Sequence, residues 1–289
     1  MKALTIYTLQ NNITTITSDM LEVSLFKPIK REEEVTSRLG FVPNIEGELV
    51  STLAGNICLR LATQKKVVNK SQFKKELAIK ELTFEQAMGR TLNKKELNEA
   101  KAQVTENLLI KTEPDDEPKF IDLLITKCGK VLVGTTTKVA EECLALLRQC
   151  IGSLPVIPLQ VNTEPCVRMT DMVLEELNEV ITLSNKVMLV TSEERKVSIT
   201  NGETRGCEAI DLIKDGAFVT SLALEYDAVI KFLLKEDLTL SSIKLDKSIT
   251  EEVEDEDAVG SFILTTTELV KCVDEIITEF GGLVNENRI

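Results

Sequence analysis

The chain has 289 residues, of which 43% are apolar, and its formal net charge is −13. It contains no histidine, which excludes a Ser-His-Asp triad, a Cys-His pair and a His-ligated metal within one chain. No apolar run approaches the roughly 20 residues of a membrane span, and the opening segment MKALTIYTLQNN lacks the apolar stretch of a signal peptide. We therefore expect a globular cytoplasmic protein without a membrane segment.

The first part of the chain predicts strands followed by a helical hairpin. From about 69 to 110, apolar residues recur at helical spacing. Gly89 can end the first helix, and Asn93 with Glu96 three residues later has capping-box spacing at the start of the second. The elements expected before the hairpin are strands at 3–9 and 49–67, a helix near 18–27 and an extended segment at 39–43.

A proline-bearing acidic stretch, TEPDDEP at 112–118, separates the hairpin from the remaining elements. Strands near 120–127 and 130–134 lead into a threonine-rich turn and a helix. The elements expected after that are strands near 186–191 and 195–200, a short helix near 206–214, and strands at 217–225, 228–234 and 239–245.

A strand, a Thr-Thr-Thr turn and a helix recur at an offset of 130 residues, in 131–152 and 261–282. Each predicted helix has an apolar face and ends at glycine. In the second copy Thr265 and Glu268 also have capping-box spacing. The sequence VGTTTK at 133–138 lacks the second glycine of a phosphate-binding loop. We therefore interpret both copies as scaffold, in which threonine caps the start of a helix.

These patterns predict an α+β fold of mixed sheets with packed helices, two similar strand-TTT-helix units and a protruding helical hairpin. An α/β body is expected at 1–68 and 119–289, with a sub-domain boundary near 165–185, and a hairpin arm with its acidic link at 69–118. The seven cysteines are odd in number and form no CxxC pair, so we expect reduced thiols and neither a disulfide framework nor a zinc site. No catalytic residue, cofactor or metal is predicted.

Positive charge is concentrated in residues 60–101, which hold eleven Lys or Arg against five Glu and leave −19 for the rest of the chain. Such asymmetry is typical of an acidic body that presents a basic arm to a polyanion. From charge alone, a solvated helix of mixed charge is the simpler interpretation. The acidic run EEVEDED at 251–257 is expected to be a solvated loop.

Four segments resemble one family in the same order along the chain. CLALLRQCIGSLPVIPLQVN at 143–162 is similar to the most recognisable stretch of the recombination-associated protein RdgC family. LGFVP at 39–43, FVTSLALEY at 218–226 and FILTTTELVKCVDEIITEFGG at 262–282 resemble further segments of that family. The resemblance covers nearly the whole chain.

The resemblance implies a DNA-binding protein that is not an enzyme. Proteins of this family form a homodimeric ring whose positively charged hole surrounds double-stranded DNA without sequence preference. They restrain RecA-driven strand exchange by occupying its DNA, and the resemblance leaves direct contact with RecA open. By this resemblance the chain is half of a ring, the hairpin reaches toward the partner, and the protein associates with the nucleoid.

Seven basic residues are candidates for DNA contacts. The resemblance transfers best to Lys74, Arg90 and Lys94. Charge alone adds Lys65, Lys66, Lys70 and Lys95.

The chain departs from the family at three places. The family often carries phenylalanines at the gate contact of the ring, where this chain has the polar segment 111–119, and Phe120 is the nearest aromatic residue. A second basic loop of the family corresponds to the uncharged Thr200-Asn201-Gly202 and to Glu203, and Ala217 replaces a family lysine. The first departure leaves the gate contact without the aromatic packing of the family, and the loop departure predicts a DNA contact that is weaker or made by backbone and amide groups.

Two other functions stay open on the sequence. The acidic surface could bind basic partners, as in a DNA-mimic protein. The abundant Asp and Glu could serve a metal-dependent hydrolase, although no two acidic residues have a spacing that indicates a metal site.

Overall fold

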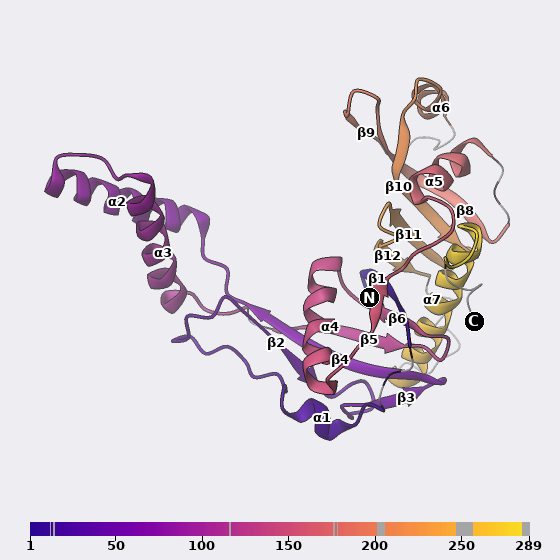
Figure 1. The fold of residues 1–289 in the computed structure, drawn as a ribbon, viewed down its shortest axis with the longest axis horizontal. Helices are drawn as coiled ribbons and strands as arrows, with labels where there is room; N and C mark the ends of the chain where they lie inside the picture. Colours follow the sequence, from indigo (N-terminus) through magenta and orange to yellow (C-terminus); the bar gives the residue numbers. More distant parts are fainter. Residues whose placement is uncertain are drawn as a thin grey trace. The chain divides into compact units, whose positions relative to one another are not determined.

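A computed structural model describes residues 1–11, 13, 15–115, 117–175, 177, 179–200, 206–246 and 257–284. Within these ranges the chain forms seven α-helices and twelve β-strands (Figure 1), so the expected α+β class is confirmed. It divides into two compact units, the first formed by Met1–Leu21, Pro43–Leu59 and Ile121–Ile289, and the second by Glu22–Val42 and Arg60–Phe120. None of the described helices has the length and apolar content needed to cross a membrane.

Antiparallel strands form the sheet of the first unit, in the order β5-β6-β1-β12-β11-β10-β8-β9, and β7 also pairs with β1. The short strand β3 pairs with the beginning of β4, which continues into the second unit. The strands are β1 Ala3–Leu9, β3 Ser51–Leu53, β4 Asn56–Lys65, β5 Lys119–Ile125, β6 Lys130–Val133, β7 Val156–Pro158, β8 Ile181–Val190, β9 Lys196–Thr200, β10 Phe218–Tyr226, β11 Ile230–Lys235 and β12 Leu240–Leu245.

Amphipathic helices bury apolar faces in this unit. In the helix α7, Leu269, Val273 and Ile276 belong to the same buried cluster as Leu222 of β10 and Leu234 of β11. Such helices are stabilised chiefly by this packing rather than by intrinsic helix propensity. The helices of this part of the chain are α1 Ser18–Glu22, α4 Thr137–Ile151, α5 Pro165–Leu174, α6 Cys207–Lys214 and α7 Ala258–Glu279.

The first predicted strand-TTT-helix unit is confirmed, but the second is wrong. Strand β6 leads into α4, whose N-cap residue Thr136 makes no side-chain capping bond. In the second copy, helix α7 already begins at Ala258, where the side chain of Asp257 accepts from the backbone N–H of Gly260. The expected capping box at Thr265 therefore does not exist, because Thr265 lies inside the helix.

The reason is that threonine can be satisfied within a helix. The hydroxyl of Thr266 donates to the carbonyl oxygen of Phe262 at 2.8 Å, one turn earlier, a bond that competes with capping. Apolar residues also continue upstream at helical spacing, at Val259, Phe262 and Ile263, and these pack against the core. The predicted apolar face from Leu269 onward is buried, as expected.

The second unit contains a two-stranded ribbon and a helical hairpin. Strand β2, Ser37–Val42, pairs with the second part of β4, from Val42 opposite Arg60 to Ser37 opposite Lys65. Helix α2, Lys70–Met88, follows β4 directly, and α3, Lys94–Lys111, packs against it (Figure 1).

Local sequence signals set the ends of both hairpin helices. Asn69 caps α2 through its side chain, and Gly89 ends it with φ +64°, in the left-handed region that glycine adopts without strain. The predicted capping box of Asn93 and Glu96 at the start of α3 is present. Along one face of α3, Ala100, Val104 and Leu108 are buried, whereas α2, which is described throughout, buries no side chain completely.

Candidate nucleic-acid interface

The predicted basic residues lie along the hairpin rather than in one cluster. Lys70 and Lys74 lie in the first turns of α2, whereas Lys94 and Lys95 open α3 at the opposite end. At about 1.5 Å per residue, the stretch of α2 from Lys74 to its end spans about 21 Å. The candidate interface is therefore elongated, and its two ends cannot bind the same phosphate.

Six exposed lysines of the hairpin have no carboxylate partner among the described residues. Two glutamates of the hairpin pair with other cations, Glu96 with Arg90 and Glu76 with Lys111. Sequence reasoning missed Lys75 and Lys101 as site residues, although both belong to the basic run. The six are Lys70, Lys74, Lys75, Lys94, Lys95 and Lys101.

Arg90 connects the residues on either side of the hairpin turn. Its guanidinium donates two hydrogen bonds to the carboxylate of Glu96, at 2.9 and 2.8 Å, and lies 5.1 Å from the ring centre of Phe84. The hydrogen bond to Glu96 raises the pKa of Arg90 above its usual value. The same carboxylate accepts from the backbone N–H of Asn93. The charge of Arg90 is thus largely engaged within the hairpin, in contrast to the exposed lysines.

The ion pair with Arg90 predicts a lowered pKa for Glu96. The hydrogen bonds from Arg90 and from the N–H of Asn93 lower the pKa of Glu96 to about 2. A depressed carboxyl pKa stabilises the folded hairpin above the unfolded value of about 4.3, and this contribution is lost as the pH falls toward 2. We expect Arg90→Gln to raise the pKa of Glu96, while the hydrogen bond from the N–H of Asn93 keeps that pKa below its ordinary value. Carboxyl carbon shifts measured by NMR against pH test this, and an ordinary midpoint in the unmodified protein would contradict it.

Lys66 does not lie on the surface. Its side chain is 4% exposed, and its ammonium group donates to the carbonyl oxygens of Arg31, Glu33 and Leu109 at 2.6, 2.6 and 3.2 Å. An ammonium group has three donors, so these bonds use all of them. We therefore leave Lys66 out of the interface, whereas the neighbouring Lys65 is exposed. The strand period places Lys66 on the same face as Gln64, but only the structure shows that this face is buried.

The structure describes Phe120 and Ala217, two of the positions at which the sequence departs from the family pattern. Phe120 is 61% exposed, with the guanidinium of Arg60 at 6.0 Å from its ring centre. Ala217, which replaces the family lysine, is buried. The loop from Asn201 to Glu203 and the acidic run at 251–256 lie outside the described residues.

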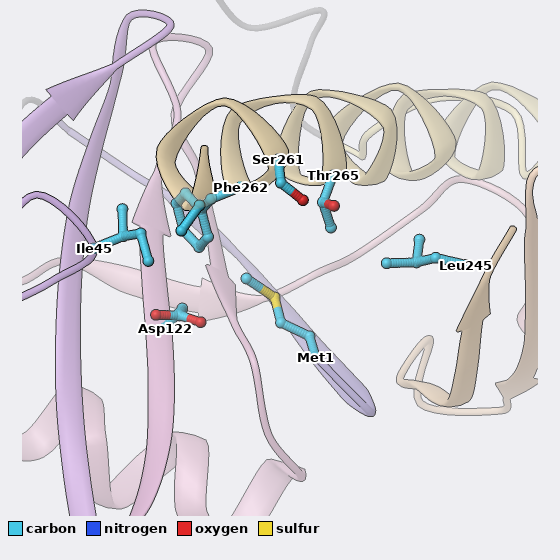
Figure 2. A pocket seen from close by; sticks show the side chains of 8 residues that line it. Met1, Ile45, Asp122, Leu245, Ser261, Phe262 and Thr265 are labelled. Atoms are coloured by element: carbon cyan, nitrogen blue, oxygen red, sulfur yellow. The ribbon is translucent and has the colours of Figure 1, made fainter. Parts of the chain in front are cut away.

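A half-open pocket of about 330 Å³ lies elsewhere, in the first unit (Figure 2). Ser261, Phe262 and Thr265 of α7 form one side of it, and Asp122 and Met1 form another. It contains none of the predicted site residues. Among the described residues, no three His, Cys, Asp or Glu side chains lie close enough together to hold a metal ion.

The cysteines behave as structural thiols. The six whose side chains are described are all free, and Cys58, Cys143 and Cys272 are buried. Burial raises the pKa of Cys58 to about 11 and that of Cys143 to about 12, so neither forms a thiolate near neutral pH.

The family model and the curated relatives that match this chain carry the same family name. The family model described as "Putative exonuclease, RdgC" matches residues 1–283. Three curated relatives share the name "Recombination-associated protein RdgC". The protein of Tolumonas auensis is 30% identical over 281 residues, 91% of each chain, and that of Mannheimia succiniciproducens is 30% identical over 260 residues, 86% of each. The protein of Proteus mirabilis is 28% identical over 304 residues, 97% of this chain and 98% of its own. On this match over almost its full length, the chain belongs to the RdgC family.

Proposed function

We propose that this protein binds double-stranded DNA without sequence preference, encircles it as a ring-shaped homodimer in the nucleoid, and thereby modulates RecA-dependent homologous recombination. The observation that carries the proposal is the row of six exposed lysines, without described carboxylate partners, along a single hairpin of an otherwise acidic chain. The curated relatives are named recombination-associated proteins, which supports the biological role.

Lysines in this arrangement suit the DNA backbone better than the bases. The 19 residues of α2 span about 28 Å, which is the length of about 8 base pairs at roughly 3.4 Å each. Lysines spread over that length can follow successive phosphates, and phosphate contacts carry no direct sequence information. The overall charge of −13 does not oppose this, because lysines gathered on one hairpin dominate the electrostatic field around it.

Exposed apolar side chains of the same unit support the homodimer. Ile79 and Leu82 stand three residues apart on α2, and Ile79 is 63% exposed. Phe120 is similarly exposed. A symmetric partner offers the same surface twice and could cover such residues in an isologous contact. Two such contacts per dimer would close a ring.

An electrophoretic mobility shift with two duplexes of unrelated sequence tests the proposal. We expect both to be retarded with equal affinity. If neither duplex is retarded and the protein instead binds a cationic protein such as a histone, the acidic surface is the functional one and the proposal fails.

The description of the matching family model also names an exonuclease, so the same labelled duplexes are incubated with Mg²⁺. Retardation with intact strands is expected. Shortening that depends on Mg²⁺ and stops with a chelator would assign a nuclease activity instead.

A further inference from the structure

Two polar residues two positions apart, Gln64 of β4 and Lys66 directly after the strand, are both buried, and residues at that spacing along an extended chain point the same way. The first, Gln64, is 6% exposed. Its side-chain oxygen accepts from the backbone N–H of Ile29, and its amide nitrogen donates to the carbonyl oxygen of Asp115, both at 2.8 Å. Ile29 precedes β2 and Asp115 follows α3. One side chain thus connects the strand to two segments distant in sequence.

The second residue, Lys66, makes the same kind of connection. Two of its three acceptors, the carbonyl oxygens of Arg31 and Glu33, belong to the segment before β2. The third is the carbonyl oxygen of Leu109 in the last turn of α3, where the final carbonyls of a helix lack partners within it. The helix C-terminus carries partial negative charge and suits an ammonium group. A buried charge is stable only when it is bonded in this way.

Together these side chains hold both ends of the hairpin. The chain enters α2 four residues after Lys66 and leaves α3 through the segment that Gln64 and Lys66 bind. Backbone bonds reinforce this, since the N–H of Asp115 donates to the carbonyl of Lys65. A tilt of about 20° at the base would move the tip of a lever about 28 Å long by about 10 Å. Small changes at the base therefore displace Lys94 and Lys95 by more than a phosphate spacing.

We propose that Gln64 and Lys66 form a clamp that sets the direction in which the α2–α3 hairpin leaves the β2–β4 ribbon. Lys66 is then a positioning residue for DNA binding, not a DNA contact. The effect on DNA rests on the proposed function, whereas the effect on hairpin direction does not.

The test uses Lys66→Met, which removes the three donors with little change in side-chain length. The control is Lys65→Met, which removes the same charge from the exposed neighbour. Spin labels introduced as noncanonical residues at the exposed positions Ser37, on β2, and Thr91, at the tip, avoid the native cysteines. Pulsed electron spin resonance then reports the ribbon-to-tip distance distribution, and circular dichroism reports whether the helices persist.

We expect a narrow distribution in the unmodified protein and in Lys65→Met, and a broadened one in Lys66→Met with the helix signal retained. Duplex affinity should fall about tenfold or more in Lys66→Met, and in Lys65→Met only by the share of a single phosphate contact. An unchanged distance distribution in Lys66→Met would overturn the clamp.

The remaining outcomes separate the two proposals. A broadened distribution in Lys66→Met, with an unmodified protein that ignores DNA, would keep the clamp and reject the DNA-binding function. If Lys66→Met does not fold, Gln64→Leu provides the same measurement, since it removes only two hydrogen bonds and leaves the three bonds of Lys66 in place. A narrow, unshifted distribution in that variant overturns the clamp equally.

Discussion

Reversal of three hairpin lysines, by Lys74→Glu, Lys94→Glu and Lys95→Glu together, is expected to remove most duplex affinity while the protein stays folded. Each neutralised phosphate contributes about 0.9 to the slope of log K against log salt. A dimer with these changes neutralises about six fewer phosphates, so the slope should become shallower by about 5 and the affinity near 0.1 M salt should fall by well over a hundredfold. Exposed charges contribute little to folding stability. Arg90 is omitted from this set because it pairs with Glu96.

A matched variant controls for total charge. Lys127→Glu, Lys138→Glu and Lys196→Glu change three exposed lysines of the first unit and alter the net charge by the same amount. Fluorescence anisotropy with a labelled duplex measures both variants, and thermal unfolding checks their stability. If the hairpin variant binds like the unmodified protein, or if the two variants lose affinity equally, the hairpin is not the interface.

Retention on closed circular DNA is the second large effect that we expect. A ring around a circle cannot slide off, whereas a ring around a linear duplex escapes at an end. High salt weakens phosphate contacts. After a high-salt challenge, most of the protein should therefore stay on the circular DNA, whereas it should dissociate from the same DNA linearised by a single cut. Gel filtration of the DNA after the challenge measures the bound fraction.

Blocking the ends of the linear molecule gives the decisive control. Bulky protein caps at both ends should restore retention to that of the circle if escape occurs by sliding. Equal loss from circular, linear and capped DNA by a protein that is dimeric in solution would mean an open clamp or surface binding. The test is demanding for this chain, since segment 111–119 has no aromatic residue and Phe120 is the nearest one.

Elements with local signals could be predicted from the sequence. The hairpin followed from helical spacing, from the glycine at Gly89 and from the pair Asn93 and Glu96, all of which act within one turn of the chain. Helix α5, Pro165–Leu174, had a signal that our prediction did not use. Proline is favoured in the first turn of a helix, and the buried Met169, Met172 and Val173 follow at helical spacing.

The start of α7 and the roles of two cations could not be predicted in the same way. A run of threonines fits a cap or a helix interior, and packing upstream of Thr265 decides between them. The burial of Lys66 depends on Leu109, 43 positions away, and the pairing of Arg90 depends on the geometry of the turn. Positive charge can be counted from a sequence, but whether a given lysine meets solvent is decided by tertiary contacts.

The salt dependence of duplex binding by the unmodified protein tests the central claim most directly. With about 4–8 phosphate contacts per dimer, log K for each of two unrelated duplexes should fall against log salt with a slope of about −4 to −7. The two slopes and affinities should agree, because phosphates carry no sequence information. A slope near zero, or a clear preference for one duplex, would contradict binding through the lysines of the hairpin.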